Sequence, residues 1–151
     1  MKMQAVTTMQ NWLLDPGSFM KRLKEYGVHD ANIRILDEGF RVPLADERKI
    51  LAILPRAVAW VREVIIESGD TIWMSARTVI PKETLTGKQK KLQYLKNKSL
   101  GSVLFKDPKL QRSRLEIKAC LPNWRRRSVF CTAGKFILLT EIFSPAVGLL
   151  K

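Results

Sequence analysis

The stretch AWVREVIIE, residues 59–67, has the β-branched residues and the alternation that are typical of a β-strand. Because strand side chains alternate between two faces, Arg62 shares its face with Trp60, Val64 and Ile66. A guanidinium keeps its proton inside a protein, so burial among these neighbours requires a carboxylate partner or an anionic ligand. The stretch therefore leaves open an internal ion pair, an arginine that extends to the sheet edge, or an anion-binding site.

The next apolar run supplies a second arginine. The turn-forming residues 68–70 join two predicted strands, residues 58–67 and 72–80, into an antiparallel pair. Arg77 shares a face of the second strand with Trp73 and Val79. Two inward arginines on neighbouring strands would attract a ligand with two negative charges.

A carboxylate interrupts a third apolar strand, FILLTEIF at residues 136–143. Both faces of this strand are apolar, so Glu141 must pair with a buried cation or hydrogen-bond to an enclosed group. Neutralisation of Arg62 by Glu141 is one possibility. One inward acid leaves an excess of positive charge beside Arg62 and Arg77, which favours a small ligand with two carboxylates or a phosphate.

The remaining pattern predicts an α+β fold, since antiparallel strands recur with helices kept apart from them. We expect strands from residue 112 onward and a hairpin around Gly134-Lys135. Helical segments are expected from Asp15-Pro16 to Gly27, after Asp46, and over residues 82–98. Residues 32–36 and 39–42 are predicted to form a hairpin around Asp37-Glu38.

Length and composition fit one soluble domain over residues 1–151, with 46% hydrophobic and 27% charged residues. Two cysteines, with no CxxC pair, and a single histidine do not provide a zinc site, so no metal is expected. No run suits a signal peptide or a membrane span, which predicts a cytoplasmic protein. The patterns of a phosphate loop, a dinucleotide-binding loop and a Ser-His-Asp triad are absent from the sequence.

The chain has a net charge of +13, from 27 basic and 14 acidic residues. Such an excess attracts polyanions and also small anionic substrates, so charge alone does not choose between them. The run Arg125-Arg126-Arg127 lacks the interleaved aromatics of a stacking platform and is interpreted as solvated surface. We therefore expect no specific nucleic-acid binding.

The residues above are part of a longer pattern that resembles the chorismate lyases. The resemblance runs in order from about residue 55 to Pro145, with a weaker match at Ser18, Lys21-Arg22 and Gly27. It is carried by these blocks: WVRE at 60–63, ARTVIP at 76–81, TLTG at 84–87, Leu100-Gly101 with Leu104-Phe105, LEI at 115–117, Trp124 with RRS at 126–128, and Gly134-Lys135 with LLTEIF at 138–143.

This resemblance implies a six-stranded antiparallel sheet with helices and helical flaps over an internal site, and no cofactor. It implies conversion of chorismate to 4-hydroxybenzoate and pyruvate, the first step of ubiquinone biosynthesis. Arg62 would bind the ring carboxylate with help from the backbone of Leu100, and Glu141 would meet the ring hydroxyl. The positive charge of Arg77, and not the resemblance, suggests that this residue binds the enolpyruvyl carboxylate.

An N-terminal flap would contact the substrate through Phe19 or its neighbour Met20, where the compared family member has a methionine. We expect a monomer. The rival hypothesis is a domain that binds an aromatic carboxylate without turning it over, like the ligand-sensing domains of some transcription regulators that share this fold. Such domains normally follow a DNA-binding helix-turn-helix module, for which residues 1–26 are too short.

Overall fold

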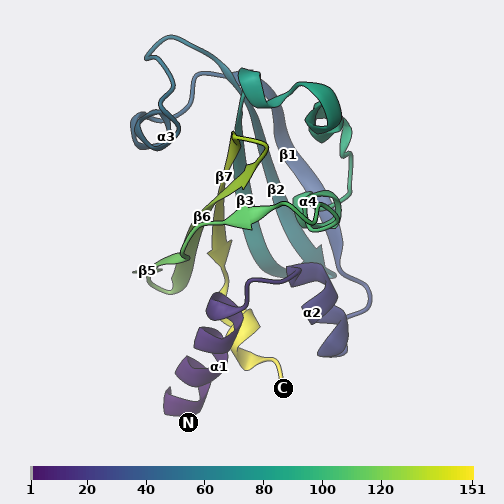
Figure 1. The fold of residues 1–151 in the computed structure, drawn as a ribbon. Helices are drawn as coiled ribbons and strands as arrows, with labels where there is room; N and C mark the ends of the chain where they lie inside the picture. The colour runs from purple at the N-terminus through teal and green to yellow at the C-terminus, as the bar shows by residue number, and fades with distance from the viewer. Residues whose placement is uncertain (1) are drawn as a thin grey trace.

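A computed structural model describes residues 2–151, with side chains from residue 8 onward. One antiparallel sheet dominates it, with helices on both faces and at one end (Figure 1). The helices are α1 (Lys2–Leu14), α2 (Phe19–Glu25), α3 (Ala45–Leu51) and α4 (Leu100–Leu104), with 3-10 helices η1 (Lys82–Thr84), η2 (Gly87–Tyr94) and η3 (Pro145–Leu149). The strands are β1 (Asn32–Arg41), β2 (Ala59–Ser68), β3 (Thr71–Pro81), β4 (Gln111–Arg112), β5 (Glu116–Cys120), β6 (Asn123–Thr132) and β7 (Lys135–Phe143).

The sheet confirms the α+β prediction and has one strand more than expected. Its order is β1-β2-β3-β7-β6-β4, and β5 also pairs with β6. Strand β4 pairs with the Phe130–Cys131 portion of β6, and β5 pairs with the portion from Asn123 to Arg127. These two short strands therefore occupy one edge of β6 in succession, so seven strands fill six positions.

The predicted hairpin of residues 58–67 and 72–80 is confirmed as β2 and β3. Its ladder starts with Ser68 opposite Thr71, and a bulge lies between Ile66 and Glu67. Beyond the bulge, Arg62 lies opposite Thr78. Directly opposed residues of antiparallel strands point to the same face, so Arg62 and Arg77 point to opposite faces.

Residues 32–41 form a single strand, and the predicted hairpin around Asp37-Glu38 is wrong. The ladder between β1 and β2 shifts between Ile35 and Asp37. Such a bulge places an extra residue in one strand while the pairing continues. Asp37 and Glu38 thus interrupt the apolar pattern within a strand, and Glu38 lies opposite Arg62.

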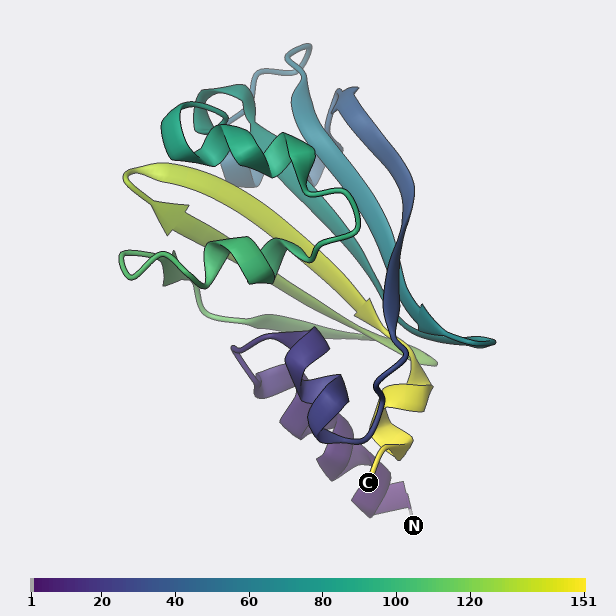
Figure 2. The ribbon, with the colours of Figure 1, turned by 90° about the vertical axis from the view of Figure 1, so that its right-hand side faces the viewer.

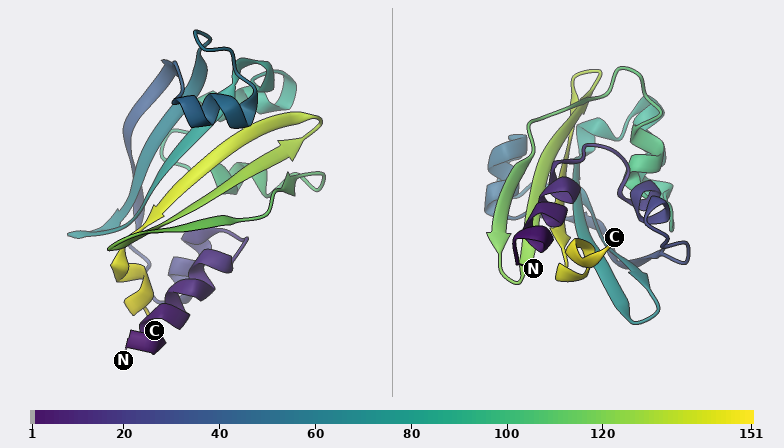
Figure 3. Two further views of the ribbon diagram at one scale, coloured as in Figure 1. Left: turned by 90° about the vertical axis from the view of Figure 1, so that its left-hand side faces the viewer. Right: turned by 90° about the horizontal axis from the view of Figure 1, so that it is seen from below.

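Helices cover the sheet unequally. Helices α2 and α4 and the 3-10 helix η2 lie on one face (Figure 2), whereas α3 lies on the opposite face (Figure 3). Helix η2 packs its Leu92 with α4 residues and with Phe130 and Ile137 of the sheet. On the opposite face a smaller cluster joins Val61, Val79 and Leu138 to the α3 region.

The N-terminal helices close the lower end of the sheet in Figure 1, beside η3. The sequence did not predict α1, whose Trp12 and Leu13 are each 1% exposed. Helix α2 begins at Phe19 rather than at Asp15-Pro16, because the Ser18 hydroxyl accepts the backbone N–H of Lys21 and caps the helix there. In residues 2–151, no helix is both long enough and apolar enough to cross a membrane.

Candidate active site

A partly enclosed pocket lies between the sheet and the helices on the face covered by α2 and α4. Its volume is about 70 Å³. Strands β2, β3 and β7 supply Arg62, Thr78 and Glu141, together with apolar side chains. The cover comes from the start of α2 with the two residues before it, and from α4 with its two capping residues. It consists of Gly17, Ser18, Phe19, Met20, Ser99, Leu100, Gly101 and Phe105.

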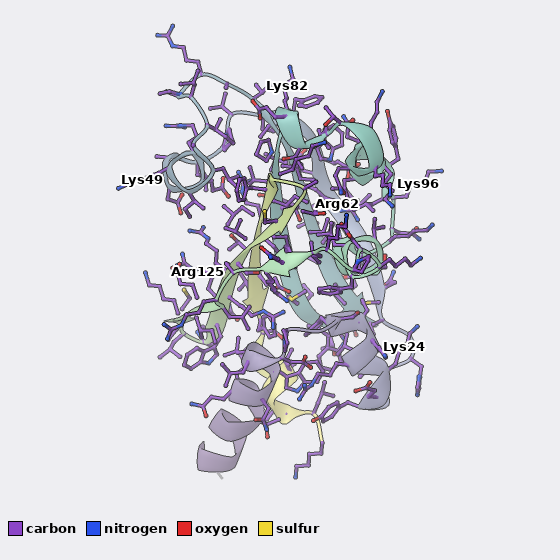
Figure 4. All side chains as sticks on the ribbon, in the orientation of Figure 1. Lys24, Lys49, Arg62, Lys82, Lys96 and Arg125 are labelled. Atoms are coloured by element: carbon purple, nitrogen blue, oxygen red, sulfur yellow. The ribbon has the colours of Figure 1, made fainter. Side chains whose placement is uncertain are left out.

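Arg62, which is labelled in Figure 4, is 3% exposed. Its guanidinium has two hydrogen-bond partners. It donates to Glu38 Oε2 at 2.8 Å and to the backbone carbonyl of Lys98 at 2.8 Å. The first contact balances its charge, and the second ties the segment before α4 to the sheet. A guanidinium carries five N–H donors, so these two bonds leave donor capacity beside the cavity. The pairing of Arg62 with Glu141, one of the possibilities left open by the sequence, is not formed, because Arg62 pairs with Glu38.

Glu141 pairs instead with Arg126, which lies opposite it in the β6–β7 ladder. Nε and Nη2 of Arg126 donate to the two carboxylate oxygens at 2.8 and 2.9 Å. Arg112 donates a longer bond to Oε1, at 3.4 Å. Glu141 and Arg126 are 4% and 2% exposed, so this is a buried pair with its charge balanced. These bonds leave one lone pair on Oε2, and Glu141 lines the pocket.

Arg112 adds a third guanidinium to the pocket. Burial is the main reason that the pKa of Arg112 falls to about 10, and repulsion from Arg126 lowers it further, while Glu141 and Asp15 oppose the shift. A pKa near 10 keeps Arg112 charged at neutral pH. Around this pocket Arg62, Arg112 and Arg126 lie near Glu38 and Glu141, while Asp15 is paired with Arg22, so the excess charge is positive.

The same arginines hold the segment between α1 and α2. Arg126 Nη1 donates to the backbone carbonyl of Asp15 at 2.7 Å, and Arg112 Nη1 donates to that of Pro16 at 2.8 Å. Asp15 also forms an ion pair with Arg22 of α2. Two guanidiniums thus bridge Glu141 to the chain that leads into Phe19 and Met20.

Five of the six residues predicted for the site line one cavity, namely Phe19, Met20, Arg62, Leu100 and Glu141. Arg77 does not. It lies on the other face, where Nε and Nη2 donate to Glu47 at 2.7 and 2.8 Å and Nη1 donates to Glu63 at 2.6 Å. The prediction that Arg77 joins Arg62 is wrong because the β2–β3 bulge reverses its face relative to Arg62.

The model of the chorismate lyase family matches residues 1–147 of this sequence. The chain belongs to the chorismate lyase family. A probable chorismate pyruvate-lyase of Marinobacter nauticus is 39% identical over 140 residues, which cover 89% of this chain and 74% of that protein. The chorismate pyruvate-lyase of Proteus mirabilis is 36% identical over 143 residues, with 93% of this chain and 83% of that protein covered.

Solved structures share the fold of this chorismate lyase family member. PhnF from Mycobacterium smegmatis superimposes with a TM-score of 0.61 at 9% identity, over 87% of this chain and 65% of that one. The effector domain of PhnF gives a TM-score of 0.56 at 11% identity, over 87% of this chain and 90% of that one. At these identities the likeness concerns the fold alone.

Sequence reasoning missed Glu38, Arg112 and Arg126 in this member of the chorismate lyase family. Arg126 was interpreted as solvated surface, but alternation along β6 turns the middle of three arginines inward. Arg127 is buried as well, at 9% exposure, and donates to Asp46 on the opposite face. A two-residue turn at Ala133-Gly134 followed by an unshifted ladder puts Arg126 on the face of Glu141, so strand parity with that turn length could have found this pair. In the described part of the chain, no group of three or more His, Cys, Asp or Glu could hold a metal.

Proposed function

We propose that this protein is a chorismate pyruvate-lyase that converts chorismate to 4-hydroxybenzoate and pyruvate, the first step of ubiquinone biosynthesis. The observation that carries the proposal is the partly enclosed pocket, in which Arg62 and Glu141 project from two strands of one sheet, β2 and β7. Membership of the chorismate lyase family supports the reaction and its substrate.

Arg62 is proposed to bind the ring carboxylate of chorismate. It is buried and charged, and it has N–H donors left after its bonds to Glu38 and Lys98. The backbone of Leu100, at the start of α4, lines the same cavity and would assist. A buried arginine that is only partly satisfied favours a carboxylate, because its planar donors match the two oxygens.

Glu141 is proposed to accept a hydrogen bond from the hydroxyl at C4 of the ring. In the reaction the C3–O bond breaks and its electrons leave with the enolpyruvyl group, which takes up a proton at carbon to give pyruvate. The ring loses the proton at C4 and becomes aromatic. Aromatisation supplies the driving force, so the pocket contributes mainly orientation and exclusion of water. Arg126 holds the carboxylate of Glu141 in place through two bonds.

The second carboxylate of chorismate needs another cation, and Arg77 lies on the wrong face. Arg112 lines the cavity, keeps its charge at neutral pH, and makes one long bond to Glu141. We therefore assign the enolpyruvyl carboxylate to Arg112. Phe19 and Met20 complete the cavity wall from the N-terminal side, and exclude water there.

The decisive test is to incubate the purified protein with chorismate and to measure 4-hydroxybenzoate and pyruvate. Equal amounts of both products are expected without an added cofactor. The rival hypothesis, a binding domain without catalysis, predicts tight binding of 4-hydroxybenzoate in calorimetry and no product at high protein concentration. That result would overturn the proposal.

We also propose that the protein works as a cytoplasmic monomer with no specific nucleic-acid partner. All the groups assigned to the reaction come from one chain, so the site needs no second subunit. Light scattering on the eluting protein should give the mass of one chain, 17.3 kDa. Elution as a dimer at all concentrations would contradict the monomer.

A further inference from the structure

The end of the molecule that carries α3 exposes apolar and basic side chains together. Leu54 is 75% exposed, Leu44 57% and Ile50 43%. We call this surface the α3 patch and define it as Leu44, Lys49, Ile50, Leu54, Arg56 and Lys82, all exposed residues of α3, its flanking segments and the start of η1. Figure 3 shows α3 and the following loop at the same end of the sheet.

Packing of α3 does not require these apolar side chains. Leu51 and Ile53 turn toward the sheet and pack on the cluster of Val61, Val79 and Leu138. Glu47 also fixes the helix through its two bonds with Arg77. Leu44, Ile50 and Leu54 point away from these contacts, so their exposure is a feature of the surface and not of the core.

A hollow of about 520 Å³ lies within this surface, between residues 51–58 and the start of η1. Apolar side chains line it, among them Leu51, Leu54 and Val58. Arg56 and Lys82 contribute two basic groups and Glu83 one acid. An apolar hollow beside basic groups suits a ligand that is both apolar and anionic.

The charges of the α3 patch are positive and largely unopposed. Within residues 8–151, Lys49, Arg56 and Lys82 form no ion pair, and Lys82 lies over the ring of Phe40. The nearby acids Asp46 and Glu47 are paired with Arg127 and Arg77, which leaves Glu83 as one exposed acid against these three basic groups. Figure 4 shows Lys49 and Lys82 extending outward at this end. The whole chain carries +13, which strengthens the attraction toward an anionic surface.

We propose that the α3 patch docks this protein on the surface of an anionic phospholipid membrane. Leu44, Ile50 and Leu54 would enter the headgroup region, while Lys49, Arg56 and Lys82 would contact lipid phosphates. Peripheral proteins bind membranes through this combination of apolar insertion and basic attraction. A nucleic acid fits less well, because the six residues of the patch include three aliphatic side chains and no aromatic ring, and Lys82 lies over the neighbouring ring of Phe40.

Docking through the α3 patch leaves the proposed active site accessible. Helix α3 lies on one face of the sheet, and the cavity with its cover from α2 and α4 lies on the other (Figures 2 and 3). Substrate entry and turnover are therefore expected to continue on the membrane. The proposal does not depend on the identity of the substrate.

The experiment is flotation of the whole protein with vesicles of phosphatidylcholine containing about 30% phosphatidylglycerol, at physiological salt. The protein should float with these vesicles and not with pure phosphatidylcholine. Leu54→Ser should lower partitioning about tenfold through lost apolar contact. The double variant Lys49→Glu with Arg56→Glu should lower vesicle partitioning at least about 25-fold, because each basic group near an anionic surface contributes about fivefold.

Matched controls lie elsewhere on the surface. Leu121→Ser changes a leucine that is 78% exposed on the β5–β6 turn, and Lys24→Glu changes an exposed lysine of α2. Both should bind as the unchanged protein does. Turnover of chorismate by each variant checks that it is folded, since none of these residues lies in the cavity.

Four results would overturn the proposal. The first is no flotation with anionic vesicles, and the second is an equal loss for Leu54→Ser and Leu121→Ser. The third concerns another basic hollow, lined by Lys88, Lys91, Lys106, Lys109 and Lys135. Loss of vesicle binding in Lys88→Glu with Lys91→Glu, and not in the α3 patch variants, would place the contact there. The fourth is tighter binding to duplex DNA than to anionic vesicles, with no change in DNA affinity in Leu54→Ser. That result would indicate a nucleic-acid partner instead.

Discussion

Each of the two faces of the sheet holds an ion-pair network around a buried carboxylate, Glu141 on one face and Glu47 on the other, and the network of Glu141 lines the proposed active-site pocket. On the pocket face, Arg62 has one carboxylate and one carbonyl as partners. On the opposite face, Arg77 gives three hydrogen bonds to Glu47 and Glu63. The first arginine retains capacity for an anion, and the second is occupied by two carboxylates.

A buried charge in a strand therefore indicates function only when its partners and its surroundings are known. The carboxylates Glu47 and Glu141 are both buried and both held by two bonds from an arginine. Glu47 lies under α3 and anchors that helix, whereas Glu141 lines the cavity. Substitutions on the two faces should then separate effects on turnover from effects on stability.

The largest effect is expected for Glu141→Gln. The amide keeps the shape of the side chain but loses its charge, and it presents a donor to Arg126. We expect the turnover number to fall about 10²- to 10⁴-fold. The rate of 4-hydroxybenzoate formation measures it, with far-ultraviolet circular dichroism as a check of folding. Glu63→Gln on the other face is the matched control, and an equal loss there would remove the distinction between the faces.

Arg62→Ala should have the next largest effect on function. It removes the charged hydrogen bonds proposed for the ring carboxylate, worth about 2–3 kcal/mol or about 30- to 150-fold in affinity. Calorimetry with 4-hydroxybenzoate measures this loss. Arg62→Lys should recover only part of it, because an ammonium cannot provide the planar pair of donors. Unchanged affinity in Arg62→Ala would place the carboxylate elsewhere.

The two bulges explain why the sequence predicted Arg62 better than Arg77. A two-residue turn at residues 69–70 followed by an uninterrupted ladder places Arg62 opposite Arg77, on one face. The bulge between Ile66 and Glu67 shifts the partner of Arg62 to Thr78. Neither Ile66 nor Glu67 is a glycine or another residue that would indicate a bulge in the sequence. Alternation therefore predicted which residues of each strand share a face, but not which residues of the two strands lie opposite each other.

The sequence also failed to predict the partner of Arg62, again because a bulge changes which residues lie opposite each other. The bulge in β1 brings Glu38 opposite Arg62, and the sequence suggested a turn at that position. Phe19, Met20 and Leu100 were predicted through the family resemblance, since periodicity alone says nothing about which flap covers a cavity. Glu141 was predicted from its own strand, because a carboxylate between apolar residues on both faces stands out locally.

Arg77→Ala should affect stability and spare catalysis. It leaves Glu47, a residue with no exposed surface, without its charged partner. We expect the free energy of unfolding to fall by about 2 kcal/mol, the cost of an unsatisfied buried group. Urea denaturation measures this change, and the turnover number at a temperature where the variant is folded should stay unchanged. A loss of turnover there would connect Arg77 to the reaction after all.

The smallest effect is expected for Asp46. The pKa of its carboxyl group is lowered mainly by the hydrogen bond from Arg127, and burial partly opposes this shift. Because the folded pKa lies below the unfolded value, the pair stabilises the protein above the unfolded pKa. This contribution is lost as pH falls through the folded pKa. Asp46→Asn should therefore reduce the free energy of unfolding at pH 7 by up to about 1 kcal/mol, as for other exposed pairs. The difference from the unchanged protein should shrink toward pH 3 in urea titrations. A difference that grows on acidification would mean that Arg127 does not stabilise the charged form.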